Sequence, residues 1–230
     1  MALHWDKAFS SLGPSLLQGI GVVVYVTIMG FLAALIISLL LAIGRTGKNK
    51  VLNKILVLFV ELIRGTPLLV QFFYIYYVVP MLLDGFFMIF GLETGIQIKP
   101  VVAGVIGFGI NYGCYMSEVI RSAIMAIDPG QREAGLALGY SERQVLFKFI
   151  IPPAIRNSVP VFGNYLVMMI KDTSLLAMIS VQELLLRTKT FASQTFLTVE
   201  AYTLLALVYL IISVPLSRLS VVLEKKLKHR

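Results

Sequence analysis

One uncharged apolar segment constrains the fold of this chain more than any other feature of its sequence. It runs from Leu16 to Ile43 and contains no Asp, Glu, Lys or Arg. A helix that spans a bilayer needs about 20 such residues, so this segment is long enough to cross a membrane. In the whole chain of 230 residues, 58% are hydrophobic and 14% are charged, whereas a typical soluble domain has about 25% charged residues. We therefore expect an integral membrane protein.

Further apolar segments of similar length follow along the chain. The expected spans cover residues 16–43, 51–79, 100–120, 159–179 and 201–223. They predict an all-α fold with five transmembrane helices in a single domain that covers residues 1–230. In the loop 80–99, the apolar piece 85–90 is too short to span, and we expect it to lie in the interface or to re-enter. A short helix is expected around residues 181–187.

The distribution of Lys and Arg predicts the orientation of these spans. The loops 44–54 and 121–156 and the tail from residue 218 contain four, five and five basic residues. The opposite loops contain only Lys7, Lys99, Arg187 and Lys189. Because cytoplasmic loops are enriched in Lys and Arg, this asymmetry places the N-terminus outside and the C-terminus in the cytoplasm.

The residue inventory argues against chemistry within the chain. The two histidines, His4 and His229, lie at opposite ends, and Cys114 is the only cysteine, which disfavours a zinc site, a His-based catalytic site and a disulfide. The segment 44–49 has neither the spacing nor the final hydroxyl of a phosphate-binding loop. We therefore expect no cofactor in this chain, and any ATP must be bound by another polypeptide.

The cytoplasmic loop 128–153 has the signals of two short helices with a sharp bend. The turn Asp128-Pro129-Gly130 starts the first helix, and Gly139 is placed to end it. Ser141 is placed to cap the second helix. We expect Pro152 and Pro153 to end that second helix.

This loop resembles the EAA loop of ABC importer permeases. The family pattern is E-A-A, three residues, G, nine residues and then I-x-L-P. Here Glu133-Ala134-Gly135 and Gly139 have this spacing, and Phe149-Ile150-Ile151-Pro152 follows at the expected distance. Segments 61–71, 115–121 and 171–175 resemble further motifs of the polar amino-acid permeases. The chain is thus similar to the permease subunits of type I ABC importers for polar amino acids.

The resemblance implies a set of partners and a location. Two permease chains, identical or paralogous, would form the pathway in the bacterial cytoplasmic (inner) membrane. Two ATPase subunits would bind ATP and magnesium, and an extracytoplasmic binding protein would deliver the amino acid. The EAA loop would dock on the ATPase; the alternative is an ordinary solvated loop, and the spacing and topology together favour the docking role. The candidate coupling residues are Arg132, Glu133, Ala134, Gly135, Gly139, Ser141, Glu142, Arg143 and Pro152.

Charges within the expected spans are candidates for the substrate pathway. Ionisable groups in a bilayer are costly unless they are paired or hydrated, so they normally face the bundle interior or a cavity. The candidates, with polar neighbours, are Glu61, Arg64, Asn111, Tyr115, Lys171, Asp172, Thr173 and Ser174. Glu61 and Arg64 could equally be a structural ion pair. Because adjacent residues on a helix point about 100° apart, Lys171 and Asp172 cannot both face one wall.

Two other functions remain as alternatives. An autonomous channel or secondary carrier is disfavoured because the chain has no internal repeat. A membrane-embedded enzyme is disfavoured because His, Cys and clustered carboxylates are missing at one depth. The sequence leaves open which amino acid is carried and whether the permease pair is a homodimer or a heterodimer.

Overall fold

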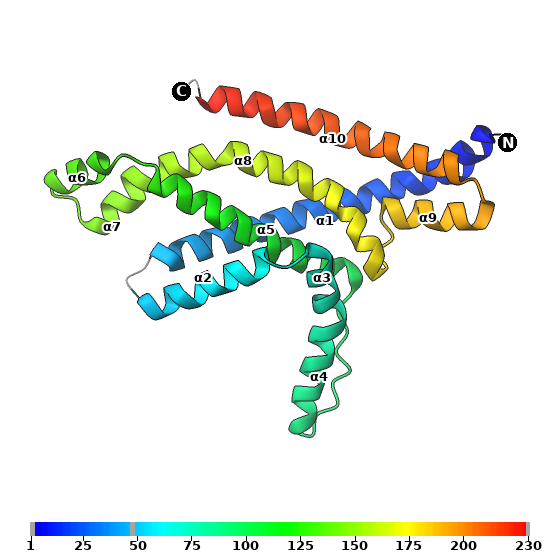
Figure 1. Cartoon of the computed structure of the whole chain (residues 1–230), viewed down its shortest axis with the longest axis horizontal. Helices are drawn as coiled ribbons and strands as arrows, with labels where there is room; N and C mark the ends of the chain where they lie inside the picture. Colours follow the sequence, from blue (N-terminus) through cyan, green and yellow to red (C-terminus); the bar gives the residue numbers. More distant parts are fainter. Residues whose placement is uncertain (1–2, 47–48, 229–230) are drawn as a thin grey trace.

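The computed structural model describes residues 3–46 and 49–228, where the regular structure is entirely helical. Five long helices share one general direction, and the chain reverses between successive ones (Figure 1). As a result, the N-terminus lies at one end of the bundle and the C-terminus at the other (Figure 1). The five helices are α1 (Trp5–Thr46), α2 (Lys50–Arg64), α5 (Pro100–Met125), α8 (Ile151–Asp172) and α10 (Thr198–Lys228).

Length and composition alone give four candidate membrane spans among the described residues. They are Trp5–Arg45, Leu68–Ile89, Glu142–Ile179 and Thr198–Val222. The third expected span, 100–120, is helical within α5, but its polar residues keep α5 out of this set. The fourth expected span, 159–179, lies within the longer stretch that begins at Glu142.

The segment 51–79, expected as the second span, is not one continuous helix. The helix α2 ends at Arg64, and α3 (Leu68–Phe73) begins after a break at residues 65–67. Pro67 adopts an extended conformation, with φ −61° and ψ 138°. Proline lacks the N–H that would continue the helical hydrogen bonds, and it disfavours helical geometry in the preceding residue, so the helix stops here.

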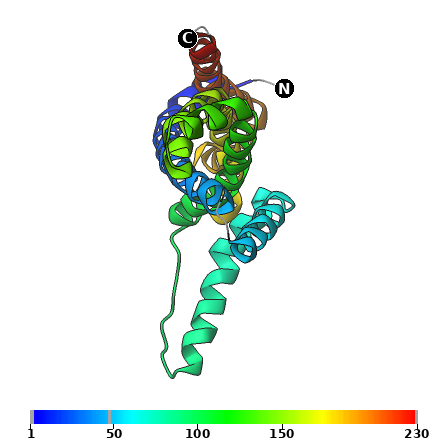
Figure 2. The ribbon, with the colours of Figure 1, turned by 90° about the vertical axis from the view of Figure 1, so that its left-hand side faces the viewer.

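The short apolar piece 85–90 is not a separate element. Residues 85–89 belong to α4 (Val79–Ile89), which continues from α3 through a π-helical turn, η1 (Tyr74–Val78). The unit α3–α4 projects across the direction of the bundle in both views (Figures 1 and 2). Residues 90–99 lead from α4 back to the bundle. Asp84 of α4 holds this segment, because its Oδ1 accepts hydrogen bonds from Thr94 Oγ1 at 2.6 Å and from the Ile96 N–H at 2.8 Å.

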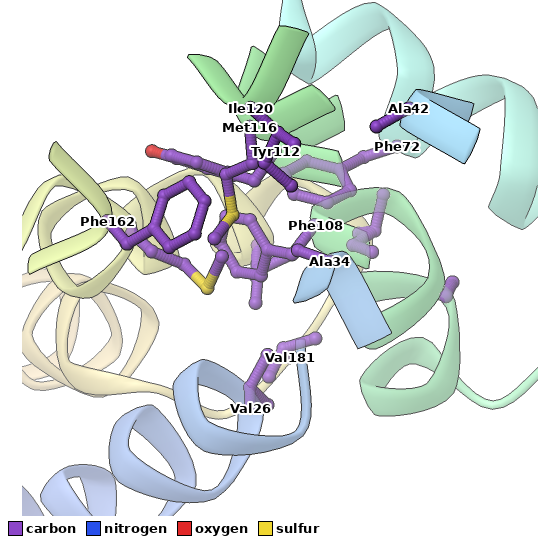
Figure 3. Packing of buried hydrophobic residues seen from close by; sticks show 14 residues of the cluster. Val26, Ala34, Ala42, Phe72, Phe108, Tyr112, Met116, Ile120, Phe162 and Val181 are labelled. Carbon is purple, nitrogen blue, oxygen red and sulfur yellow. The ribbon is translucent and has the colours of Figure 1, made fainter. Parts of the chain in front are cut away.

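The bundle packs most closely where α1 crosses α5. A Cβ atom on Gly109 would lie 2.9 Å from Ala33 Cβ, and one on Gly113 would lie 2.7 Å from Ile37 Cγ2. Only glycine permits this approach, as expected for small residues between membrane helices. Next to this contact, Phe72 and Phe108 meet edge-to-face at 5.2 Å in a buried cluster that joins α1, α3, α5 and α8 (Figure 3).

The segment that is expected to dock on an ATPase, called the coupling segment below, lies at the same end of the bundle as the C-terminus (Figure 1). The segment comprises α6 (Pro129–Ala137), α7 (Glu142–Val145) and the π-helical turn η2 (Leu146–Ile150). The expectation that Pro152 and Pro153 end the second helix is wrong, because both lie in the first turn of α8. The π-helical turn η2 immediately precedes both prolines, so their missing N–H groups fall where the regular helical hydrogen bonding is already interrupted.

The opposite end of the bundle carries the N-terminus and α9 (Leu184–Thr195) (Figure 1). Between α8 and α9 the chain passes through a 3₁₀ helix, η3 (Thr173–Ile179). The helix expected around residues 181–187 is therefore present, but it starts later and is longer. Its N-cap is Glu183.

Candidate functional site

A cavity of about 460 Å³ lies where the α2–α3 break faces α5 and α8. Four of the residues predicted for the substrate pathway line it: Arg64, Asn111, Tyr115 and Asp172. Seven further residues complete the lining, namely Gly65, Thr66, Pro67, Leu68, Tyr112, Tyr165 and Met168. The helix break therefore positions the backbone at a polar cavity instead of packing it between helices.

Asp172 is held in place by a tyrosine from another helix. It is the last residue of α8, and its Oδ2 accepts a hydrogen bond of 2.6 Å from the hydroxyl of Tyr112 on α5. Tyr112 is buried and packs against Tyr165 with ring centroids 5.8 Å apart. This contact fixes the carboxylate at the cavity wall, where it is the only acidic group that the described part of the chain contributes.

Among the described residues that line the cavity, Arg64 provides the only cationic group. It ends α2, and its guanidinium carbon lies 5.1 Å from the ring centroid of Tyr115 on α5. The Tyr115 hydroxyl donates to the Arg64 carbonyl at 3.4 Å. Within the described residues, Arg64 forms no ion pair with Glu61, so the alternative of a structural pair is not seen. Glu61 is exposed and does not line the cavity.

Gln71 stabilises the backbone of the α2–α3 break beside the cavity. Its Nε2 donates to the Ile63 carbonyl at 2.6 Å, to the Thr66 carbonyl at 3.1 Å and to Thr66 Oγ1 at 2.9 Å. Its Oε1 accepts a bond of 3.1 Å from Asn111 Nδ2. These bonds satisfy backbone groups that the break removes from helical pairing. The sequence signal for this role is a glutamine just after a Gly-Thr-Pro break in an apolar segment.

The other predicted pathway residues lie outside the cavity lining. Lys171 is exposed, while the neighbouring Asp172 faces the cavity. The hydroxyls of Thr173 and Ser174 donate to the carbonyls of Ile170 and Lys171, at 2.6 and 2.9 Å. These two hydroxyls therefore form hydrogen bonds within their own helical turn. Sequence reasoning did not select Thr66, Gln71 or Tyr165, because their role depends on how three helices meet.

The bend of the coupling segment has a complete helix-ending motif. The N–H of Gly139 donates to the Leu136 carbonyl at 2.9 Å, and the N–H of Tyr140 donates to the Gly135 carbonyl at 3.2 Å. This pair of bonds is a Schellman motif, and Gly139 provides its left-handed residue with φ +82°. Ser141 then caps α7 in a capping box with Gln144.

Both coupling helices are held to each other by packing and by charge. A Cβ on Gly135 would lie 2.9 Å from Val145 Cγ2, so glycine at this position lets α6 approach α7 closely. Arg132 donates to both carboxylate oxygens of Glu142, at 3.2 and 2.5 Å. Such a bidentate pair adds geometric specificity even at an exposed site. The two helices therefore form one preassembled unit.

Several predicted coupling residues remain available on the surface of this unit. Glu133, Ala134 and Arg143 are exposed, and Leu138 is 75% exposed beside them. The guanidinium of Arg143 lies over the Phe147 ring, 5.9 Å from its centroid. Pro152 is exposed in the first turn of α8. Because η2 ends at Ile150 and α8 begins at Ile151, the coupling unit continues into α8 without a loop.

Comparisons with known proteins agree with this arrangement. Residues 27–229 match the family described as binding-protein-dependent transport system inner membrane component. The chain is 34% identical over 228 residues to the glutamine transport system permease protein GlnP of Escherichia coli (strain K12), covering 99% of each chain. It is also 34% identical over 227 residues to the L-cystine transport system permease protein TcyB of Bacillus subtilis (strain 168), covering 98% of this chain and 92% of that protein.

Solved structures give the same result for the fold. A chain from a structure described as an amino acid ABC transporter with histidines superposes with a TM-score of 0.85 at 29% identity, covering 98% of this chain and 100% of that one. A chain of the MetNI methionine ABC transporter superposes with a TM-score of 0.61 at 16% identity, which shows the fold alone. On the evidence of the family match and of relatives that align over nearly their whole length, this chain belongs to the binding-protein-dependent transport system inner membrane components, the permease subunits of ABC importers.

Proposed function

We propose that this chain forms, with a second permease chain, the membrane pathway of a type I ABC importer for a polar amino acid. The observation that carries this proposal is the cavity beside the α2–α3 break, which presents one carboxylate and one guanidinium. The names of the relatives that transport glutamine and cystine, and the solved transporter described with histidines, support the same substrate class.

The two cavity charges suit the backbone of a free amino acid. Asp172 would receive the substrate ammonium group, and Arg64 would receive its carboxylate through a planar fork of N–H donors. Both charged groups of the cavity would then pair with the ammonium and carboxylate groups of the substrate, and neither would remain for its side chain. The remaining polar lining consists of Asn111, Thr66 and tyrosine hydroxyls. This set favours a neutral polar side chain over a charged one.

The proposed membrane topology has five passes, made by α1, α2 with α3, α5, α8 and α10. The N-terminus would be outside and the C-terminus in the cytoplasm of a bacterium, with the chain in the inner membrane. Support comes from the alternating directions of these helices and from the opposite ends at which the termini lie (Figure 1). The basic residues gathered in the loops at the C-terminal end agree with this orientation.

The proposed energy source is a pair of ATPase subunits that bind ATP and magnesium. The exposed face of α6 and α7 would dock on them, with Glu133, Ala134, Leu138 and Arg143 at the contact. Gly135 and Gly139 would shape this unit, and the Arg132–Glu142 pair would hold it. Because α7 passes through η2 into α8 without a loop, movement of the docked unit would be transmitted to Asp172 at the far end of α8.

Uptake into proteoliposomes tests the pathway. The chain is reconstituted with its ATPase and binding-protein partners, and radiolabelled glutamine uptake is measured with ATP inside. Asp172→Asn and Arg64→Gln should each reduce uptake by about tenfold or more, since each variant loses a charge-assisted contact worth roughly 1.5–3 kcal/mol. Arg218→Gln, an exposed change on α10, is the matched control and should transport normally.

Two results would contradict this function. Uptake by the purified chain without ATPase partners would indicate an autonomous carrier. Strong competition by lysine or glutamate, but none by neutral polar amino acids, would contradict the proposed substrate class.

A separate measurement tests the coupling role. Glu133→Lys should lower substrate-stimulated ATPase activity while the complex stays assembled, because it reverses a charge on the proposed docking face. Glu93→Lys, in the exposed loop beyond α4, reverses a charge far from that face and should have no effect. Normal stimulation in the Glu133→Lys transporter would exclude this residue from coupling.

A further inference from the structure

Hydrogen bonds at the α2–α3 break determine which way the side-chain amide of Gln71 points. Three oxygen atoms lie within 3.1 Å of one of its terminal atoms: the carbonyl oxygens of Ile63 and Thr66 and the hydroxyl oxygen of Thr66. A carbonyl oxygen can only accept a hydrogen bond, so this terminal atom must be the NH2 nitrogen. The atom of Gln71 that faces Asn111 is therefore the amide oxygen, Oε1.

The direction of the Gln71 amide in turn determines that of Asn111. Because Gln71 Oε1 can only accept, the Asn111 atom at 3.1 Å from it must be the NH2 nitrogen, Nδ2. Asn111 is only 6% exposed and lines the cavity that contains Arg64 and Asp172. Its other polar atom, Oδ1, has no donor among the described residues and is not sealed from solvent, so it presents a free acceptor to the cavity.

Most hydroxyl groups of the cavity lining use their hydrogens within the protein. Tyr112 donates to Asp172, and Tyr115 donates to a backbone carbonyl at the end of α2. The Thr66 hydroxyl donates to two further carbonyls of α2, at 3.0 and 3.2 Å. Of the lining hydroxyls in the described structure, only that of Tyr165 makes no hydrogen bond. The neutral part of the lining therefore offers mainly acceptors to a ligand.

We propose that Asn111 selects a substrate whose side chain is an uncharged hydrogen-bond donor, namely a carboxamide such as that of glutamine. This inference rests on the proposed function, in which Asp172 and Arg64 bind the ammonium and carboxylate groups of the amino acid. The carboxamide NH2 donates to Asn111 Oδ1. Gln71 is a positioning residue, because its hydrogen bond to Asn111 Nδ2 keeps that oxygen directed at the cavity.

The same arrangement disfavours charged side chains of either sign. A carboxylate has only acceptors, so it would meet another acceptor at Asn111. An ammonium or guanidinium group can donate, but Asp172, the only carboxylate that the described lining provides, is paired with the substrate ammonium. A charge without a partner is costly away from bulk water. The free Tyr165 hydroxyl remains available to the carboxamide oxygen.

A matched pair of ligands tests this selection. γ-N-methylglutamine and the γ-methyl ester of glutamate have side chains of nearly equal size, but the first has an N–H where the second has an ester oxygen. Each ligand competes with radiolabelled glutamine for the permease–ATPase complex in nanodiscs, without binding protein, so that the permease alone provides the selectivity. The ester should bind about tenfold more weakly than the amide, because it leaves the Asn111 acceptor unpaired.

Variants assign the discrimination to Asn111 and to its direction. Asn111→Leu should bind the two ligands about equally, whereas Asn164→Leu, at an exposed position of α8, should keep the wild-type difference. Gln71→Leu allows the Asn111 amide to turn its NH2 to the cavity, so the ester should gain affinity relative to the amide. A merely structural loss would weaken the binding of both ligands alike and leave their ratio unchanged.

The outcomes separate this inference from the proposed function. Equal binding of the two ligands by the wild-type complex, or an unchanged ratio in Gln71→Leu, would overturn the inference. Wild-type affinity for radiolabelled glutamine in both Arg64→Gln and Asp172→Asn would instead contradict the proposed function. If those two variants lost glutamine binding while the wild type bound both test ligands equally, only the inference would fail. A wild-type complex that bound no glutamine would overturn both.

Discussion

Tyr112 on α5 donates a hydrogen bond of 2.6 Å to Asp172 at the end of α8. In the sequence, α5 precedes the coupling segment and α8 follows it, so this bond joins the two helices that flank that segment. Any movement of α8 relative to α5 therefore changes the position of the only carboxylate in the cavity lining. The Tyr112–Asp172 bond thus belongs to the wall of the proposed substrate cavity and also connects it, through α8, to the end of the bundle that carries α6 and α7.

Removing the hydroxyl from this bond should weaken substrate binding. Tyr112→Phe leaves the ring contacts in place but removes a hydrogen bond to a charged group, worth about 1.5–3 kcal/mol. We expect the KM for amino-acid uptake in proteoliposomes to rise by about tenfold. Tyr25→Phe, on an exposed face of α1, controls for the loss of a hydroxyl elsewhere. An unchanged KM in Tyr112→Phe would show that this bond does not position Asp172 for substrate.

Gln71 should be important for stability as well as for the cavity. Gln71→Leu removes a donor to the Thr66 carbonyl and the acceptor for the buried side chain of Asn111. Buried polar groups left unsatisfied cost about 1–3 kcal/mol. For a chain of this size, each kcal/mol lowers Tm by about 2–4 °C. Thermal unfolding in detergent should show this decrease, while Gln194→Leu at an exposed position of α9 should keep the wild-type Tm.

The α2–α3 break and its surroundings separate what the sequence can predict from what it cannot. Residues 51–79 are apolar enough to span a membrane, but a count of apolar residues does not show where the helix is interrupted. The interruption at Pro67 is a local effect of backbone geometry, so it could in principle be read from the chain. The meeting of Arg64, Tyr115 and Asp172 could not, because it depends on the relative placement of α2, α5 and α8.

The coupling segment was more predictable because its signals are local. Gly139 and Ser141 act through hydrogen bonds to residues within four positions of themselves. Gly135 was predicted to be a coupling residue, yet its close neighbour in the structure is Val145 of the same unit. That contact joins two helices across a bend, and spacing alone does not determine it.

The backbone conformation of Gly139 should decide which substitutions uncouple the transporter. Its φ of +82° disfavours most side chains, although a Cβ there would meet no atom within 4 Å. The cost is therefore strain and not a clash, about 1–2 kcal/mol for an ordinary residue and less for Asn. Substrate-stimulated ATPase activity should decrease in the order wild type, Gly139→Asn, Gly139→Ala and Gly139→Val.

A matched control exists for the Gly139 series. Gly91 has the same type of backbone conformation, with φ +73°, in the turn beyond α4. Gly91→Ala should introduce similar strain without changing the stimulation of ATPase activity. If Gly139→Asn and Gly139→Val had equal activity, the left-handed conformation would not be what maintains the coupling unit.

Glu183 should make stability depend on pH. It lies between the candidate spans Glu142–Ile179 and Thr198–Val222, as the buried N-cap of α9. Burial raises the pKa of its carboxyl above the ordinary value of 4.5, although the N–H groups of Leu185 and Leu186 and the Tyr209 hydroxyl, which hydrogen-bond to it, act in the opposite direction. The folded state therefore binds this proton more tightly than the unfolded state does, so stability increases as pH falls through the folded-state pKa towards 4.5.

The comparison with Glu183→Gln isolates this contribution, because an amide does not titrate. Thermal unfolding in detergent from pH 8 to pH 5 should show Tm of the wild type increasing relative to Glu183→Gln as the pH decreases. At a pH well above the folded-state pKa, the difference should be constant. Glu93→Gln, at an exposed position, should differ from the wild type by the same amount throughout. A wild-type advantage that instead shrinks with decreasing pH would mean that the hydrogen bonds to the carboxylate outweigh burial and lower the pKa.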